Sequence, residues 1–136
     1  ISENLKGQIR SLSQASRNAN DGISMIQVAE GGLAEVSNIM TRMRELGIQS
    51  SSDTIGATER GFLNKEVQQL KEEMQRIVSS TRFGDLKLID GTGASFDFQV
   101  GVGSDPEVDR ITFNAGETNA GIDALGVDGF DFSTKE

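Results

Sequence analysis

Apolar and small residues recur at steps of three and four along the first fifty positions, apart from two steps of seven. This seam comprises Ile1, Leu5, Leu12, Ala15, Ala19, Ile26, Ala29, Leu33, Val36, Met40 and Met43. Such spacing keeps residues on one face of an α-helix, and no proline interrupts the run. It predicts one helix over residues 1–50, about 75 Å long at ~1.5 Å per residue. A helix of that length indicates a bundle or a coiled coil.

Three glycines fall inside this predicted helix. Gly22 lies at the small centre of the seam, and Gly31 and Gly32 follow. Each costs about 1 kcal/mol of helix propensity relative to alanine. Because small residues allow a neighbouring element to come close, we expect close packing at all three. The alternative is a break in the helix near residue 22.

A second helix is predicted after a polar connector at residues 50–56, where SSSDTIG is typical of a helix stop and restart. The steps of three and four return over residues 63–77, which predicts a helix from about 56 to 80. The short connector makes it antiparallel to the end of the first helix. The expected core of the rod comprises Leu12, Ala15, Ala19, Ile26, Leu33, Val36, Met40, Met43, Leu63, Val67, Leu70, Met74 and Ile77.

From residue 84 onward the period changes to two. Phe96, Phe98, Val100 and Val102 alternate with other residues, and Ile111 and Phe113 follow a turn region rich in glycine. This pattern is typical of β-hairpins, and residues 117–131 are expected to form a short helical turn and a loop. The predicted fold class is α+β. It is a long helical rod, formed by a helix of about 50 residues and a shorter antiparallel helix, with β-hairpins. Residues 1–83 form its helical part and residues 84–136 the hairpin and loop part of the same domain.

Both ends of the sequence look cut. Residue 1 already lies in the helical register without a preceding cap, and Ser133 followed by Glu136 has the spacing of a capping box. A capping box marks the first turn of a helix. We therefore expect a truncated chain and an incomplete bundle that lacks a C-terminal helix.

A second stripe lies to the side of the seam near the end of the first helix. It comprises Glu35, Ile39, Arg42, Leu46 and Gln49. Folding of a single chain does not require a mixed face of this kind, so the stripe predicts contact with a partner. The alternative is partial cover by the second helix, chiefly at Ile39.

Composition and charge exclude several kinds of chemistry. The chain has no Cys and no His, which excludes disulfides, thiol nucleophiles, the usual zinc sites and imidazole catalysis. The net charge of −8 falls on residues 84–136, with three basic and eleven acidic residues, whereas residues 1–83 carry ten of each. The acidic part argues against nucleic acid, and no apolar run is long enough to cross a bilayer.

A calcium site is the remaining chemical possibility. Asp105, Glu107 and Asp109 alternate, but Arg110 stands where a calcium-binding EF-hand loop needs glycine. We therefore expect no enzyme, no catalytic residue, no cofactor and no metal, and neither a nucleic-acid nor a membrane partner.

Three stretches of the sequence resemble the N-terminal half of bacterial flagellin. They are SRNANDGIS at 16–24, AEGGLAEVSNIMTRMRELGIQS at 29–50 and STRFGDLKLIDG at 80–91. The resemblance covers residues 1–91 closely and the strand region loosely. It implies an inner rod domain with a long helix, a short antiparallel helix, β-hairpins and a third helix from the C-terminal part of the chain, beginning near Ser133.

The resemblance also implies a function. A flagellin is a structural subunit that is exported through the flagellar secretion apparatus and polymerises with other flagellin subunits into the extracellular filament used for motility. The alternative is a non-flagellar long-helix coiled-coil protein of secretion or signalling, for which 45 residues of strand and turn have no evident use.

A further implied partner is an animal Toll-like receptor, which senses flagellins of many bacteria at an RxRELxxQ region of the rod helix. The corresponding residues here are Arg42, Arg44, Glu45, Leu46 and Gln49, whereas Met43 and Gly47 depart from the usual pattern. The same side would be buried between subunits, so the receptor should bind monomer and not filament. The full expected interface, for receptor or subunit, is Glu35, Ile39, Arg42, Glu45, Leu46, Gln49 and Glu66.

Overall fold

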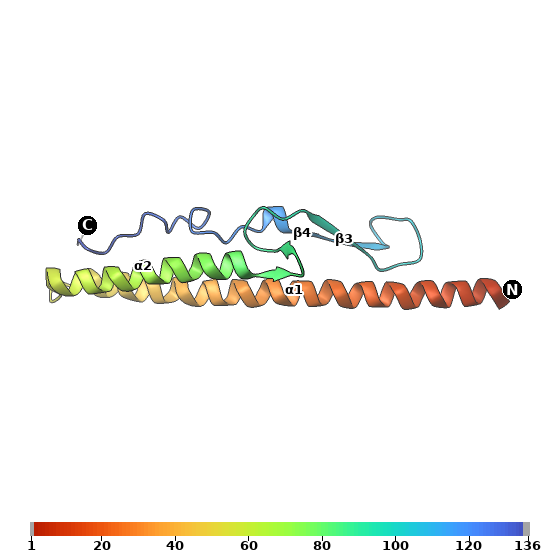
Figure 1. Ribbon diagram of the computed structural model, residues 1–136, viewed down its shortest axis with the longest axis horizontal. Coiled ribbons are helices and arrows are strands. Elements are labelled where there is room, and N and C mark those ends of the chain that lie inside the picture. The colour runs from red at the N-terminus through yellow and green to blue at the C-terminus, as the bar shows by residue number, and fades with distance from the viewer. Residues whose placement is uncertain (1, 135–136) are drawn as a thin grey trace.

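The computed structural model describes residues 2–134. Its elements are α1 (Ser2–Ser50), α2 (Ala57–Ser80), β1 (Arg82–Phe83), β2 (Leu86–Lys87), β3 (Ser95–Gln99), β4 (Arg110–Asn114) and the 3-10 turn η1 (Ala115–Glu117). Figure 1 shows α1 running the length of the molecule, with α2 folded back antiparallel along its C-terminal half. The predicted α+β rod, with a long helix, a shorter antiparallel helix and small hairpins, is confirmed.

The first helix runs unbroken through its glycines, as predicted, over 49 residues. Its last turn carries no basic residue of its own. Instead, Arg60 of α2 donates from Nε to the carbonyl of Ser50 at 3.0 Å and from Nη2 to the carbonyl of Ser52 at 3.1 Å. The bond to Ser50 satisfies an acceptor that the helix end leaves free, and the two bonds together bring a cation to the negative end of the helix dipole.

Two of the three glycines are sites of close packing. A Cβ atom on Gly22 would lie 3.2 Å from the ring of Phe98, and one on Gly32 would lie 2.5 Å from Oγ1 of Thr81. No atom lies within 4 Å of a Cβ built on Gly31. The prediction of close packing is therefore wrong at Gly31, because that position faces away from the neighbouring elements.

The buried face of α1 is displaced from the predicted seam. The buried residues of α1 are Ala15, Gly22, Met25, Ala29, Gly32, Val36, Met43, Leu46 and Ser50. Leu12, Leu33 and Met40 were expected in the core but are 55%, 37% and 36% exposed. Each of them stands three positions before a buried residue (Ala15, Val36 and Met43), about 60° around the helix from it, and so lies at the edge of the buried face.

The remaining predicted core residues divide between buried and half-buried positions. Ala15, Val36, Met43, Val67, Met74 and Ile77 are buried, and Ala19, Ile26, Leu63 and Leu70 are half-buried. Leu88, Ile89, Ala120 and Val127 complete the core from the C-terminal half of the chain. The core thus lies where α1, α2 and the returning chain meet.

The strands form two separate antiparallel pairs. β1 pairs with β2 across a turn in which Gly84 has a positive φ of 61°. β3 pairs with β4, and Phe96 stands opposite Phe113 and Phe98 opposite Ile111. Because side chains alternate along a strand, these apolar pairs share one face, and it is the face that meets α1 at Gly22.

The chain after β4 returns over the helical pair and ends beside the connector between α1 and α2 (Figure 1). Within 117–131, where a short helical turn and a loop were expected, the amide of Leu125 donates to the carbonyl of Gly121 at 3.0 Å, as in one turn of a helix, and η1 lies just before this segment. The predicted capping pair ends at Glu136 and the predicted seam begins at Ile1, both outside the described residues. Neither α1 nor α2, as described over residues 2–134, is apolar enough along its length to span a membrane.

Candidate partner-binding surface on the helical pair

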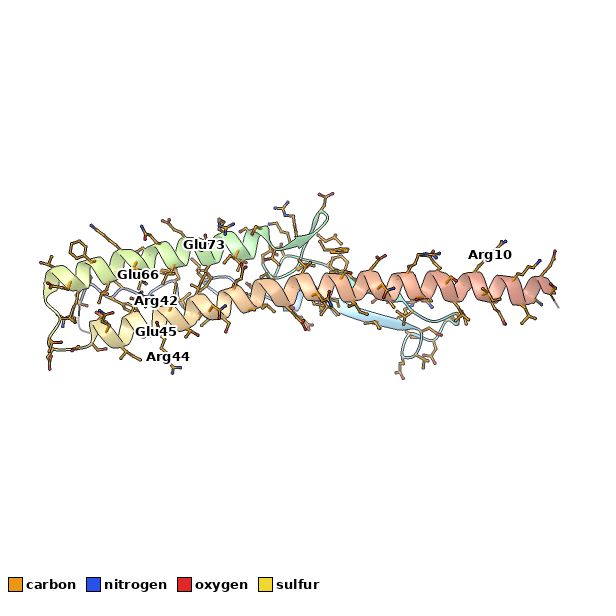
Figure 2. The ribbon with its side chains drawn as sticks, turned by 90° about the horizontal axis from the view of Figure 1, so that it is seen from below. Arg10, Arg42, Arg44, Glu45, Glu66 and Glu73 are labelled. Carbon is orange, nitrogen blue, oxygen red and sulfur yellow. The ribbon has the colours of Figure 1, made fainter. Side chains whose placement is uncertain are left out.

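Arg42 bridges the two helices on their exposed side. Its Nη2 lies 2.7 Å and its Nε 2.9 Å from Oε1 of Glu66 on α2, while its Nη1 lies 3.2 Å from Oε2 of Glu45, one turn along α1. Figure 2 shows the three side chains gathered between the helices, whereas Arg44 points away from α2. The antiparallel pairing of α2 along α1 is what brings residue 66 beside residue 42.

The two carboxylates fix both the charge and the direction of this guanidinium. The hydrogen bond to Glu66, and after it the hydrogen bond to Glu45, raises the pKa of Arg42 above its ordinary value. All three side chains are largely exposed, so the ion pairs add little to folding stability. They place the guanidinium of Arg42 between the two carboxylates.

The rest of the predicted stripe divides into exposed and buried positions. Glu35, Glu45 and Gln49 are exposed on α1. Ile39 is half-buried and packs against the core, which agrees with the alternative expectation that the second helix partly covers it. Leu46 is only 1% exposed and belongs to the core. Its assignment to the outward stripe is therefore corrected, because α2 packs on α1 at this position and covers the side chain.

Sequence reasoning missed an apolar groove on a different side of α1 from Arg42. The groove has a volume of about 590 Å³ and lies near the end of α1, on the side of Arg44. Its walls include Met40, Met43, Gly47 and Ile48 of α1, together with the rings of Phe130 and Phe132. The only signal in the sequence is that Met40 and Ile48 are apolar positions beside the buried seam.

A second exposed feature is an apolar stripe on α1. Leu5, Ile9, Leu12, Ile23, Leu33 and Met40 are each exposed by more than a third. They follow helical spacing along a line beside the buried face, and Met40 at one end of the line also forms a wall of the groove with Phe130 and Phe132. Within residues 2–134, no group of three or more acidic side chains is arranged to hold a metal ion.

Comparison with known proteins shows which family has this architecture. The family model described as the bacterial flagellin N-terminal helical region matches residues 1–94. The chain belongs to the bacterial flagellin family. A flagellin of Halalkalibacterium halodurans is 52% identical over 104 residues, which are 76% of this chain and 38% of that protein. The polar flagellin A of Vibrio parahaemolyticus is 39% identical over 136 residues, which are 100% of this chain and 35% of that one.

Solved flagellin structures share the fold. The crystal structure of Bacillus cereus flagellin matches with a TM-score of 0.73 at 29% identity, covering 88% of this chain and 66% of that chain. A structure of FliC from Burkholderia pseudomallei matches with a TM-score of 0.67 at 28% identity, covering 74% and 37%. The chain thus spans little more than a third of the curated flagellins named above.

Proposed function

We propose that this chain is the rod region of a structural subunit, not an enzyme, which polymerises with other flagellin subunits into the extracellular flagellar filament. Membership of the flagellin family supports this function. The observation that carries it is the exposed apolar stripe of α1, from Leu5 to Met40. Covering a half-exposed leucine or isoleucine contributes on the order of 1 kcal/mol, so a stripe of six favours association with further helices.

The test removes apolar character from the stripe without touching the core. Ile9→Gln and Leu12→Gln together, in the complete subunit that contains this region, should shorten or abolish filaments seen by electron microscopy. Both side chains are more than half exposed, so the circular dichroism of the variant should match the wild type. Arg10→Gln, on another side of the same turn, is the matched control (Figure 2). Normal filaments from the double variant would refute the proposal.

The geometry around Arg42 supports a second partner, the flagellin-sensing Toll-like receptor of an animal host. An arginine with its planar donors held in one direction has the properties of an interface hot spot. Glu45 and Glu66 contact it, and Glu35 and Gln49, about two helical turns to either side on α1, complete the proposed contact side, which neighbouring subunits would bury in a filament. The receptor should then bind the monomer.

A binding titration of the monomer with the receptor ectodomain tests this partner. Arg42→Ala should weaken binding by about thirtyfold, the equivalent of roughly 2 kcal/mol. Gln49→Ala should weaken it less, because an amide makes neutral hydrogen bonds. Arg44→Ala removes the same charge from the side that points away and should bind as the wild type does. Leu46→Ala is unsuitable, since it would open a cavity in the core. Unchanged binding by Arg42→Ala would show that this side is not the receptor's contact.

A further inference from the structure

The segment 128–132, called the strap below, is held on the helical pair through its backbone. Ser50 Oγ donates to the carbonyl of Phe132 at 2.9 Å, and the amide of Phe132 donates to Asn64 Oδ1 at 3.1 Å. Gln68 Nε2 donates to the carbonyl of Phe130 at 3.2 Å. In these contacts the side chains of the helical pair bind backbone groups of the strap, which every residue type carries. No strap side chain takes part in them.

Lys71 makes the central contacts of this arrangement. It is only 8% exposed, and its ammonium donates to the carbonyl of Asp128, to the carbonyl of Phe130 at 3.2 Å and to Gln68 Oε1 at 3.4 Å. Three partners match the three donors of an ammonium group. Burial of a charge is unfavourable unless its donors are satisfied, so closure of the strap and burial of Lys71 depend on each other.

The strap is also seated by apolar contacts at its two ends. Val127, directly before it, is buried in the core. At the other end the ring of Phe132 lies against Gly47, where a Cβ atom would be 3.2 Å from the ring. The stacked rings of Phe130 and Phe132 have centroids 5.9 Å apart and line the apolar groove beside α1. Opening of the strap would therefore remove one wall of that groove.

We propose that Ser50, Asn64, Gln68 and Lys71 form a binding site for a polypeptide backbone that turns at Asp128 and Gly129, that the strap occupies it, and that Lys71 is the positioning residue that keeps the strap closed. Asn64, Gln68 and Lys71 follow one another at steps of four and three, so they share one face of α2. The ligand class is a segment that begins with a tight turn and directs its carbonyls at α2. This site is distinct from the surface around Arg42 and does not depend on the proposed partners.

Hydrogen exchange of the 136-residue chain tests the proposal, because the strap contains its own reporters. The amide of Phe132 is bonded to Asn64 and the amide of Phe130 to the carbonyl of Val127 at 3.1 Å. In Lys71→Met, which keeps an unbranched side chain of similar length, both amides should exchange about tenfold faster or more. The amides of α1 and α2 should stay within about twofold of the wild type.

Three further variants separate the possible causes. Lys65→Met removes the same charge from an exposed position of α2 and should change nothing in the strap. Lys71→Arg retains several donors and should restore most of the protection. Asp131→Asn removes the strap carboxylate that interacts with the charge of Lys71 and leaves every strap carbonyl in place, so the strap should stay closed.

Three results would overturn the proposal. Unchanged strap exchange in Lys71→Met would show that Lys71 does not hold it. Equal acceleration in α1, α2 and the strap would show that Lys71 supports the fold in general. Opening by Asp131→Asn as large as that by Lys71→Met would show that attraction between side-chain charges, and not recognition of the backbone, closes the strap.

Discussion

Gly31 and Gly32 are neighbours on α1 for which the structure predicts opposite responses to the same substitution. An alanine at Gly31 meets no atom within 4 Å, whereas its Cβ at Gly32 would lie 2.5 Å from Oγ1 and 2.8 Å from Cγ2 of Thr81 and 3.0 Å from Cδ1 of Ile89. Thr81 has little freedom to move. It is buried at the end of α2, and both its amide and its hydroxyl donate to the carbonyl of Ile77, at 2.9 and 2.7 Å.

The magnitudes follow from two opposing effects. Alanine is favoured over glycine inside a helix by about 1 kcal/mol, and this gain applies equally at both positions. Extra volume in a packed site costs about 1–3 kcal/mol, and this cost applies only at Gly32. We therefore expect Gly31→Ala to stabilise the chain by about 1 kcal/mol and Gly32→Ala to destabilise it by about 1 kcal/mol.

Urea unfolding followed by far-ultraviolet circular dichroism measures both changes. The double variant Gly32→Ala with Thr81→Ala supplies the control, since removal of Oγ1 and Cγ2 makes room for the new methyl group. It should be more stable than the sum of the single changes predicts, by about 1–2 kcal/mol. Equal stabilisation by both glycine substitutions, or additive behaviour of Gly32→Ala and Thr81→Ala, would refute the inferred contact.

Three other outcomes are expected. Leu46→Ala should lower the free energy of unfolding of this chain by about 3 kcal/mol, and Leu33→Ala by less than about 1 kcal/mol, because only Leu46 is fully buried. Equal losses in denaturant titrations would contradict the observed choice of the side of α1 that is buried. Burial alone would raise the pKa of Asp90, but hydrogen bonds from the amide and hydroxyl of Thr92 and the ammonium of Lys87 outweigh it and lower that pKa. The ionised form of Asp90 is thus favoured in the folded state. Its contribution to the stability of the fold, present above about pH 4, should be lost as the pH falls through the lowered pKa. In this acid range the free energy of unfolding of Asp90→Asn should converge on that of the wild type. The 136-residue chain alone should not grow into long filaments, because its exposed apolar stripe needs further helices to cover it. Light scattering that reveals such growth would contradict this need.

The sequence by itself determined the local structure of this chain. Steps of three and four predicted helices over 1–50 and about 56–80, and the structure has α1 at Ser2–Ser50 and α2 at Ala57–Ser80. Alternation predicted the pairing of apolar residues on one face of β3 and β4. These features depend on residues close together in the chain, so the period of the pattern carries the information.

Only the tertiary structure decided which side of α1 is buried. The exposed apolar stripe of α1 borders its buried face, about 60° around the helix from it, and either could meet α2. Periodicity shows that a helix has an apolar face but does not show what packs on it. Leu46 therefore looked like an outward position although it lies in the core, and Leu33 looked like a core position although it is exposed.

The same reason explains why adjacent glycines and a lysine could not be assigned from the sequence. Gly31 and Gly32 have similar neighbours in the sequence. Only the packing of Thr81, about fifty positions later in the chain, against Gly32 distinguishes them. Lys71 stands among polar residues that predict a solvated face of α2. Its burial depends on carbonyl groups of Asp128 and Phe130, which lie 57 and 59 positions further along the chain. Contacts of that range leave no trace in a local pattern, because peptide carbonyls are the same in every residue.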